Sequence, residues 1–249
     1  MFVENIQLEG VGNPTLKAYI QEPSEEMPVY AKRPSILVIP GGGYHFCSDR
    51  EADPIAMAFM AQGYSAFVLR YSINEAAQWP NPLRDAESAL KLIRDRAEEW
   101  GLMPDKIAAI GFSAGGHLAA ALGTLGEVRP NAMILGYPCI LAEEECLQEF
   151  NAPNLEDKVT KETPPTFIFA ASDDGRVPIR HSLRFADALD VAGIPFQLHI
   201  FDQGNHGFSL ATKEVSNSKY AVELYKEPKR WLKMCVDWLD RIFEVGPKE

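Results

Sequence analysis

A serine set between glycines is the residue of this sequence best suited to chemistry. Ser113 is the centre of the segment Gly111-Phe112-Ser113-Ala114-Gly115, which has the pattern G-x-S-x-G. Glycines two positions before and after the serine let backbone segments approach where side chains would collide, so the serine can occupy a strained turn with its hydroxyl exposed. The apolar run 107–110 before the turn is typical of a buried parallel strand, and the alanine-rich stretch 116–122 after it favours a helix. This context indicates a nucleophile rather than a glycine-rich connection.

Candidate partners for the serine lie further along the chain. A serine hydroxyl needs a base that takes its proton and a third group that orients the base. His206 is the candidate base, because it lies in the glycine-flanked segment 204–208 directly after the last expected strand. Asp174 is the candidate orienting carboxylate, because it follows an apolar strand and precedes Gly-Arg-Val-Pro. The adjacent Asp173 is expected to bond the backbone of its own turn.

The other four histidines receive different interpretations. His199 sits in an alternating strand pattern and is expected to be structural, and His117 is expected to pack beneath the serine turn. His181 opens an expected helix and is expected to face solvent, while His45 lies near a glycine triplet and is a candidate pocket residue. Since a base must be neutral to accept a proton, activity that depends on His206 should fall as the pH drops through about 6 to 7.

The glycine triplet 41–43 is the expected source of hydrogen-bond donors for a negatively charged intermediate. Gly42 and Gly43 have no side chain to block their amides, and the Ala114 amide lies unpaired at the start of a helix. A phosphate-binding loop is the alternative, but neither G-x-G-x-x-G nor G-x-x-x-x-G-K is present. The aromatic residues expected to line the substrate pocket are Tyr44, His45, Trp79 and Tyr137.

Alternating strand and helix patterns surround these residues from Ser35 onward. The expected strands are 35–39, 65–69, 107–110, 132–137, 166–170 and 196–201. The expected helices are 53–62, 82–101, 116–122, 182–192 and 228–243. This alternation predicts a mainly parallel α/β sheet with helices on both faces. Two earlier strands, at 5–9 and 16–21, are expected to join the same sheet in a single domain spanning 1–249. Ligands bind beyond the carboxyl ends of parallel strands, where every candidate residue falls.

Composition limits the classes of partner. The 249 residues carry 24 Lys and Arg against 35 Asp and Glu, a formal net charge of −11, spread along the chain without a basic stripe. We therefore expect no nucleic-acid partner and no anionic membrane surface. Four cysteines without C-x-x-C spacing indicate reduced thiols rather than a metal site. Neither a signal-peptide pattern nor an apolar run of about 18 residues is visible, so cytoplasmic residence is expected.

Taken together, four motifs resemble the α/β-hydrolase esterases. They are Pro40–Tyr44, Gly111–His117, Asp174–Pro178 and Gly204–Phe208. The resemblance covers about 35–243 and is greatest to the acetyl esterase and acetyl-xylan-esterase-like branch, which is related to hormone-sensitive-lipase-type enzymes. It implies an α/β-hydrolase fold and hydrolysis of a small-molecule carboxylic ester through an acyl-enzyme. It also implies that Ser113, Asp174 and His206 form the triad, with no metal or organic cofactor.

The sequence departs from this family pattern at two places. Pro40 replaces the histidine that usually begins the glycine loop, and proline cannot donate a hydrogen bond, so the loop must be held differently. The long helical lid of lipase-like relatives is also missing, and only the acidic segment 143–165 is long enough for a partial cover. An open pocket favours short acyl groups, acetyl foremost, carried on a sugar or another small alcohol.

Other functions on the same scaffold stay open. Aryl-formamidases share the triad, as do prolyl-oligopeptidase-like peptidases, although a peptidase would normally bring an additional domain. A binding protein without catalytic activity would normally lack a triad member, and all three candidates are present here. Association with further copies of the chain is left open.

Overall fold

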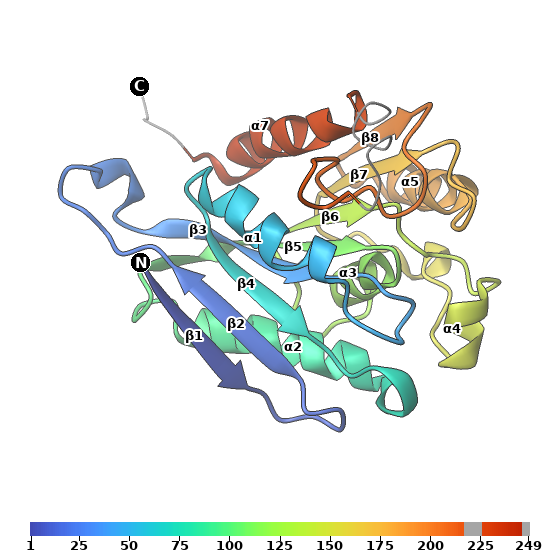
Figure 1. Ribbon diagram of the computed structural model, residues 1–249, viewed down its shortest axis with the longest axis horizontal. Helices are drawn as coiled ribbons and strands as arrows, with labels where there is room; N and C mark the ends of the chain where they lie inside the picture. The colour runs from blue at the N-terminus through green and yellow to red at the C-terminus, as the bar shows by residue number, and fades with distance from the viewer. Residues whose placement is uncertain (217–225, 246–249) are drawn as a thin grey trace.

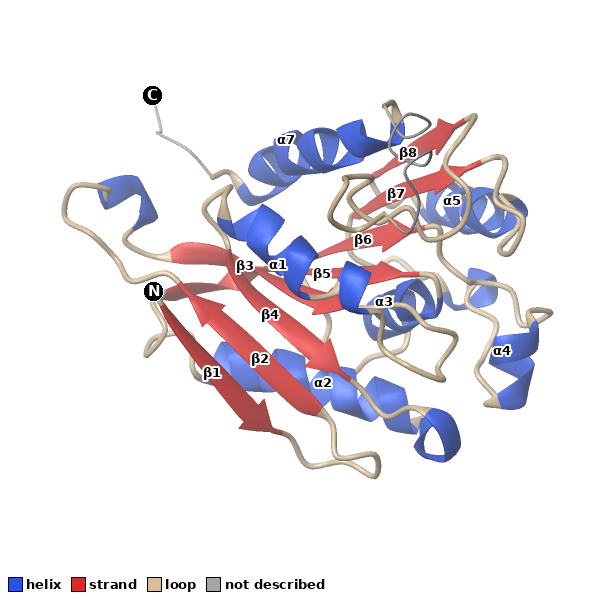
Figure 2. Ribbon diagram, viewed as in Figure 1, coloured by secondary structure: helices blue, strands red, loops and turns tan. Residues whose placement is uncertain are grey.

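The computed structural model describes residues 1–216 and 226–245 of the chain. Within them, eight strands form one sheet in the order β1-β2-β4-β3-β5-β6-β7-β8 (Figures 1 and 2). The strands are β1 (Phe2–Gln7), β2 (Thr15–Ile20), β3 (Arg33–Ile39), β4 (Ser65–Arg70), β5 (Leu102–Phe112), β6 (Ala132–Gly136), β7 (Thr166–Ala171) and β8 (Phe196–Phe201). Strands β3 to β8 pair in parallel, while β2 pairs antiparallel with β1 and β4. The predicted mainly parallel α/β sheet is confirmed, and the two N-terminal strands extend it.

Helices cover both faces of this sheet. The α-helices are α1 (Asp53–Met60), α2 (Asn81–Asp95), α3 (Ala114–Thr124), α4 (Glu145–Glu149), α5 (Arg180–Ala192) and α7 (Trp231–Phe243). Short 3₁₀ helices are η1 (Pro28–Tyr30), η2 (Asp49–Glu51), η3 (Asn74–Ala77), η4 (Glu156–Lys158) and η5 (Pro228–Arg230). Helices α2, α3 and α5 pack on one face, and α1 and α7 pack on the other (Figure 2).

Burial on both faces explains why the central strands are continuous apolar runs. On β3, Leu37 and Ile39 belong to the cluster beneath α2, α3 and α5. Ile36 and Val38 point the other way, into the cluster beneath α1 and α7. Because side chains alternate along a strand, a strand covered on both faces needs apolar residues at every position.

The largest differences between predicted and observed element ends are at the start of β5 and the end of α2. Strand β5 begins at Leu102, earlier than the apolar run indicated, because Leu102 lies opposite Arg33 across a register shift. Helix α2 ends at Asp95 rather than continuing to Gly101, and the residues between form turns. Neither difference displaces a candidate residue, since each of these lies beyond the carboxyl end of a strand.

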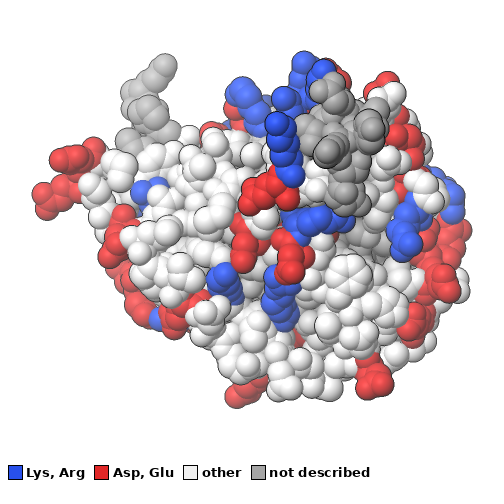
Figure 3. Space-filling view, viewed as in Figure 1, with Lys and Arg blue, Asp and Glu red and all other residues white. Residues whose placement is uncertain are grey.

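Charged side chains of both signs are interspersed on the face shown in Figure 3. In the described part of the chain, no helix has the length and apolar character needed to cross a bilayer.

Candidate active site

Ser113 occupies a sharp turn between β5 and α3. Its φ of 53° and ψ of −120° lie in a region that side chains rarely adopt. The turn is possible because its flanking glycines let backbones touch. A Cβ at Gly111 would collide with the carbonyl oxygen of Gly115, and one at Gly115 would collide with the carbonyls of Ile39 and Pro40. The serine is therefore held at the carboxyl end of the sheet by close backbone packing on both sides.

The three predicted triad residues meet in one hydrogen-bonded chain. His206 Nε2 lies 2.9 Å from Ser113 Oγ, and His206 Nδ1 lies 2.7 Å from Asp174 Oδ2. Ser113 follows β5, Asp174 follows β7 and His206 follows β8, so three strand ends at the same edge of the sheet supply the three side chains. A carboxylate can only accept, so Nδ1–H donates to Asp174, and Nε2 is left to accept the serine proton.

The Asp174 carboxylate is fixed from two sides. Its side chain is 1% exposed, and its other oxygen accepts hydrogen bonds from the amides of Arg176 at 2.8 Å and Val177 at 2.9 Å. The prediction that Asp173 bonds its own turn is wrong. Asp173 Oδ1 instead accepts from the Asn205 amide at 2.8 Å and so links the aspartate loop to the histidine loop. A sequence pattern could not show this, because the partner is 32 residues away.

The amides of Gly42, Gly43 and Ala114 point to no acceptor in the part of the chain that the structure describes. Gly42 and Gly43 have positive φ angles of 130° and 63°, which turn the loop sharply beside Ser113. Free amides at a loop and a helix start are what an oxyanion requires. These three residues stay the predicted oxyanion donors.

Three hydrogen bonds hold the glycine loop without the histidine that Pro40 replaces. The Tyr71 hydroxyl donates to the Pro40 carbonyl at 2.7 Å, and the Ser48 amide donates to the Gly41 carbonyl at 2.9 Å. The Gly41 amide donates to the carboxylate of Glu51 at 2.9 Å. None of these partners was predicted. The segment 48–51 is polar and indicates a solvent-exposed loop, so nothing in the sequence pointed to a buried carboxylate there.

The predicted pocket residues lie in different places. Tyr44 is 0% exposed and Tyr137 is 1% exposed, so a substrate cannot contact their side chains in this structure, and the prediction that they line the pocket does not hold for either. The Tyr44 hydroxyl lies 2.8 Å from His117 Nδ1. His45 is half-exposed, 3.2 Å from the Glu149 carboxylate, and stays a predicted pocket residue. Trp79 is partly exposed and packs edge-on against His117.

Two further histidines are buried in the interior. His117 packs beneath the serine turn as predicted, with Nε2 donating to the Pro153 carbonyl at 2.9 Å, and burial lowers its pKa to about 4. The prediction that His181 faces solvent is wrong. His181 is 0% exposed, its Nδ1 accepts the Ile140 amide at 2.9 Å, and burial lowers its pKa. The loop after β6 folds back onto the start of α5 and covers it.

The acidic segment 143–165 reaches the glycine loop, where a partial cover was expected. Its helix α4 places Cys146 Cβ 3.9 Å from the position that a Cβ on Gly43 would take. The Phe150 carbonyl, at the end of α4, accepts the Trp79 amide at 3.0 Å. The cover is thus short and lies beside the glycine loop and Trp79.

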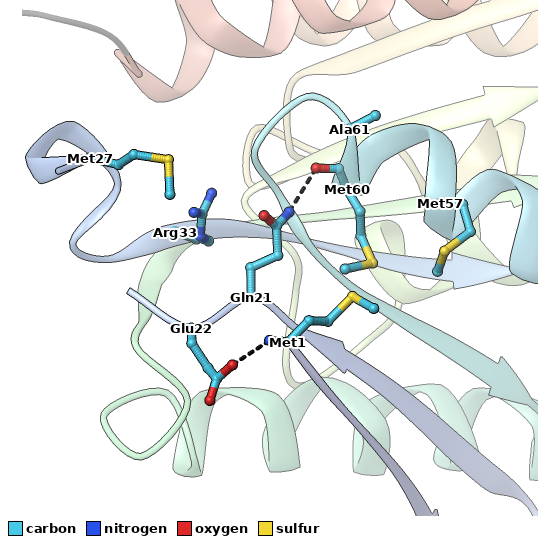
Figure 4. Close-up of a pocket in the computed structure, with 8 residues that line it drawn as sticks. All are labelled: Met1, Gln21, Glu22, Met27, Arg33, Met57, Met60 and Ala61. Atoms are coloured by element: carbon cyan, nitrogen blue, oxygen red, sulfur yellow. Dashed lines mark hydrogen bonds and ion pairs between the residues drawn. The ribbon is translucent and has the colours of Figure 1, made fainter. Parts of the chain in front are cut away.

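Two cavities differ in their chemistry. One of about 170 Å³ opens beside His206 and is lined by Arg50, Asn205, His206, Gly207, Phe208, Val215 and Ser216. A larger one of about 340 Å³ lies at the amino end of β3, beside the end of α1 (Figure 4). It is lined by Met1, Gln21, Glu22, Met27, Arg33, Met57, Met60 and Ala61, none of them a predicted site residue. Among the described residues, no group of three or more His, Cys, Asp or Glu side chains could hold a metal ion.

A mainly parallel sheet that presents a Ser–His–Asp chain at its strand ends, with the serine on a strand–turn–helix, defines an α/β-hydrolase. Comparisons with known proteins agree. The BD-FAE family model matches residues 22–133, and the prolyl oligopeptidase family model matches residues 134–237. A crystal structure of an α/β-hydrolase enzyme from a Medee basin deep-sea metagenome library is 45% identical, with a TM-score of 0.93 over 98% of this chain and 99% of that chain. The chain belongs to the α/β-hydrolase family.

Two relatives that are similar to this chain act on acetyl esters by name. The acetyl ester-xyloside bifunctional hydrolase of Caldicellulosiruptor lactoaceticus is 32% identical, with a TM-score of 0.81 over 98% of this chain and 97% of that one. The acetylxylan esterase of Xylanibacter ruminicola is 31% identical over 80% of this chain and 45% of its own length. The chain spans about half the length of the curated relatives it matches.

Proposed function

We propose that this protein is a serine carboxylic-ester hydrolase that cleaves short-chain esters, acetyl esters foremost. The observation that carries the proposal is the continuous chain from Ser113 Oγ through the imidazole of His206 to the carboxylate of Asp174, with contacts of 2.9 Å and 2.7 Å. Ester hydrolysis is the chemistry that such a chain supports beside unpaired amides.

In the proposed reaction, Ser113 Oγ attacks the acyl carbonyl while its proton passes to His206 Nε2. The Asp174 carboxylate stabilises the imidazolium that forms, and the amides of Gly42, Gly43 and Ala114 hold the oxyanion. Collapse of the tetrahedral intermediate transfers the proton from Nε2 to the departing alkoxide, leaving an acyl-serine. A water then attacks the acyl carbon and loses its proton to Nε2. Collapse of this second tetrahedral intermediate breaks the bond to Ser113 Oγ, which takes the proton back from Nε2, and releases the carboxylic acid.

The proposed substrate is an acetyl group on a sugar or another small alcohol. The cover formed by α4 is only five residues long, which favours an open site and a small acyl group. The cavity beside His206 is lined mainly by polar residues and suits a hydroxyl-rich leaving group. The acetylxylan esterase and the acetyl ester-xyloside hydrolase, both similar to this chain, support the same class. Cytoplasmic residence is part of the proposal, and the four free cysteines support it.

Hydrolysis of p-nitrophenyl acetate by the purified protein and its Ser113→Ala variant tests the proposal. We expect the variant to lose about three or more orders of magnitude in kcat. Labelling with a fluorophosphonate should vanish in the same variant. Near-full activity of Ser113→Ala would contradict the assignment. Faster cleavage of an octanoyl than of an acetyl ester would contradict the short-acyl part alone, and preference for an aryl formamide would move the protein to that class of amidase.

A further inference from the structure

Glu51 is a buried acid that the proposed reaction does not use. It ends the 3₁₀ helix η2, which follows the glycine loop, and it is 3% exposed. Its carboxylate faces the active-site turn, because a Cβ at Gly41 would lie 2.7 Å from Glu51 Oε2 and 3.1 Å from Ser113 Cβ. A carboxylate in this place is close to the nucleophile without contacting it directly.

The two oxygens of Glu51 bind two different loops. Oε2 accepts the Gly41 amide at 2.9 Å, at the start of the glycine loop. Oε1 accepts the Tyr137 hydroxyl at 2.6 Å, and that hydroxyl in turn accepts the Ser209 amide at 3.0 Å. Ser209 lies three residues after His206, and the Tyr137 ring packs edge-on against the His206 ring at 5.2 Å. One carboxylate thus joins the predicted oxyanion donors to the loop of the predicted base.

The rest of η2 strengthens the same connection. Arg50 donates from Nη1 to the Gly207 carbonyl at 3.2 Å, and its own carbonyl accepts the Ser209 hydroxyl at 2.6 Å. The Ser209 carbonyl accepts the indole N–H of Trp231 at 2.8 Å, which anchors the histidine loop to α7. The glycine loop and the histidine loop, far apart in the sequence, therefore share one buried network.

Burial of this carboxylate is costly. Desolvation raises the pKa of Glu51, and two accepted hydrogen bonds, with the charges of His206 and Arg50, offset part of that cost. An apolar side chain of similar size would avoid the desolvation penalty. A carboxylate retained here is explained by what its two oxygens hold in place.

We infer that Glu51 is a positioning residue. Through Gly41 and Tyr137, it holds the oxyanion loop and the histidine loop in the relative positions that attack by Ser113 requires. The inference rests on the proposed ester hydrolysis. Glu51 contacts no reacting atom, so its effect is on the placement of groups that do. Removal of one oxyanion donor costs about 10²- to 10³-fold in kcat, and a misplacement of about 1 Å in a catalytic site can cost about 10²-fold.

Two substitutions separate hydrogen bonding from side-chain volume. In Glu51→Gln, the amide oxygen can still accept from Gly41. The amide nitrogen can donate to the Tyr137 oxygen, which reverses the direction of that hydrogen bond but keeps the two loops linked, so we expect kcat within about fivefold of the wild type. In Glu51→Met, similar volume is kept but both acceptors are lost. We expect about a 100-fold loss of kcat with KM for p-nitrophenyl acetate changed by less than about threefold. Rates are expressed per site that reacts with a fluorophosphonate, which excludes unfolded protein from the count.

The inhibition constant of an inhibitor that mimics the tetrahedral intermediate tests the positioning role directly. A loss of stability alone would not change this constant. An aryl trifluoromethyl ketone adds to the serine and places an oxyanion at the predicted donors. Its Ki should rise in Glu51→Met by about the factor by which kcat/KM falls, because both depend on the same oxyanion contacts. Acetate, a ground-state product, should inhibit both proteins equally. Should Glu51→Met fail to fold, Glu51→Asp carries the test, since it keeps the charge but is one methylene too short to bind both loops.

Three outcomes would overturn the inference. One is a Glu51→Met or Glu51→Asp protein with kcat within about threefold of the wild type. Another is an unchanged Ki for the trifluoromethyl ketone alongside a reduced kcat. The last is a Glu51→Gln protein as impaired as Glu51→Met, which would show that a hydrogen-bonded link between the two loops is not what sets the rate. Glu98 is an exposed acid paired with Lys32, so Glu98→Gln is the matched control and should have the kcat of the wild type.

The failure of this inference can be told from the failure of the proposed function. If Ser113→Ala were fully active, the proposed function itself would fail, whereas an inactive Ser113→Ala with a normal Glu51→Met would remove only this inference.

Discussion

Replacement of His117 by glutamine should change how the stability of the protein depends on pH. His117 is completely buried, and burial lowers its pKa to about 4, whereas an unfolded histidine titrates near 6.5. Between these two values the unfolded chain binds a proton that the folded protein does not bind. The free energy of unfolding contributed by this residue is therefore intact above about pH 6.5 and is lost as the pH falls toward 4.

The size of this loss follows from the shift. One pKa unit corresponds to about 1.4 kcal/mol, so a shift of about 2.5 units costs about 3 kcal/mol once the pH is below 4. At pH 5, where the unfolded histidine is charged and the folded one is mostly neutral, the loss is about 2 kcal/mol. In His117→Gln there is no charge to bind, so this part of the pH dependence disappears. The amide nitrogen can still donate to the Pro153 carbonyl and the amide oxygen can accept from the Tyr44 hydroxyl, but the edge-on packing of the imidazole against Tyr44 and Trp79 is lost, which costs about 1 to 3 kcal/mol at every pH.

Urea unfolding of both proteins at pH 7 and pH 5 is the assay. We expect His117→Gln to be the less stable protein at pH 7, and the difference between the two to shrink by about 2 kcal/mol at pH 5. His181 and the buried acids are present in both proteins, so their contributions cancel in the comparison. A difference that stayed constant between the two pH values would refute the reasoning, because it would mean that His117 titrates alike in the folded and unfolded states.

Further expectations concern the triad and the serine turn. Asp174→Asn should lower kcat on p-nitrophenyl acetate by about 10⁴-fold, because an amide no longer selects the tautomer of His206 that leaves Nε2 unprotonated. Asp173→Asn is the control: it keeps an acceptor for the Asn205 amide, so its kcat should stay within about threefold of the wild type. Equal losses of kcat in the two variants would show that the wrong carboxylate has been assigned. Gly115→Ala should abolish fluorophosphonate labelling and lower the midpoint of thermal unfolding, because the new methyl group would collide with the Pro40 carbonyl. A variant that is labelled and as stable as the wild type would show that the glycine loop can move to accommodate the methyl group.

Most of the fold could be predicted because its signals are local. The central strands contain continuous apolar runs because both faces are covered, and α2 and α7 carry their apolar residues on one side. The turn at Ser113 and the loops of Asp174 and His206 could be located for the same reason. Each lies directly after a strand, and in a parallel sheet those ends share one edge.

The supporting contacts could not be predicted because they join distant segments. Glu51 lies in a polar stretch that indicates solvent exposure, and its burial depends on Tyr137, 86 residues away. His181 is covered by the loop after β6, which a local pattern cannot show. Tyr44 and Tyr137 were expected at the pocket from their place near strand ends. Their hydroxyls instead find partners in the interior, and only the folded structure decides between these two arrangements.

The serine and the histidine that meet at 2.9 Å are 93 residues apart, and β8, which delivers the histidine, is the last strand at its edge of the sheet. Closing so long a stretch of chain is among the slower and more entropically demanding events of folding. Turnover is therefore a stricter gauge of a completed native state than any measure of helix or strand content. In a preparation with a normal circular dichroism spectrum but little activity, we therefore expect that the contact between Ser113 and His206 has not formed.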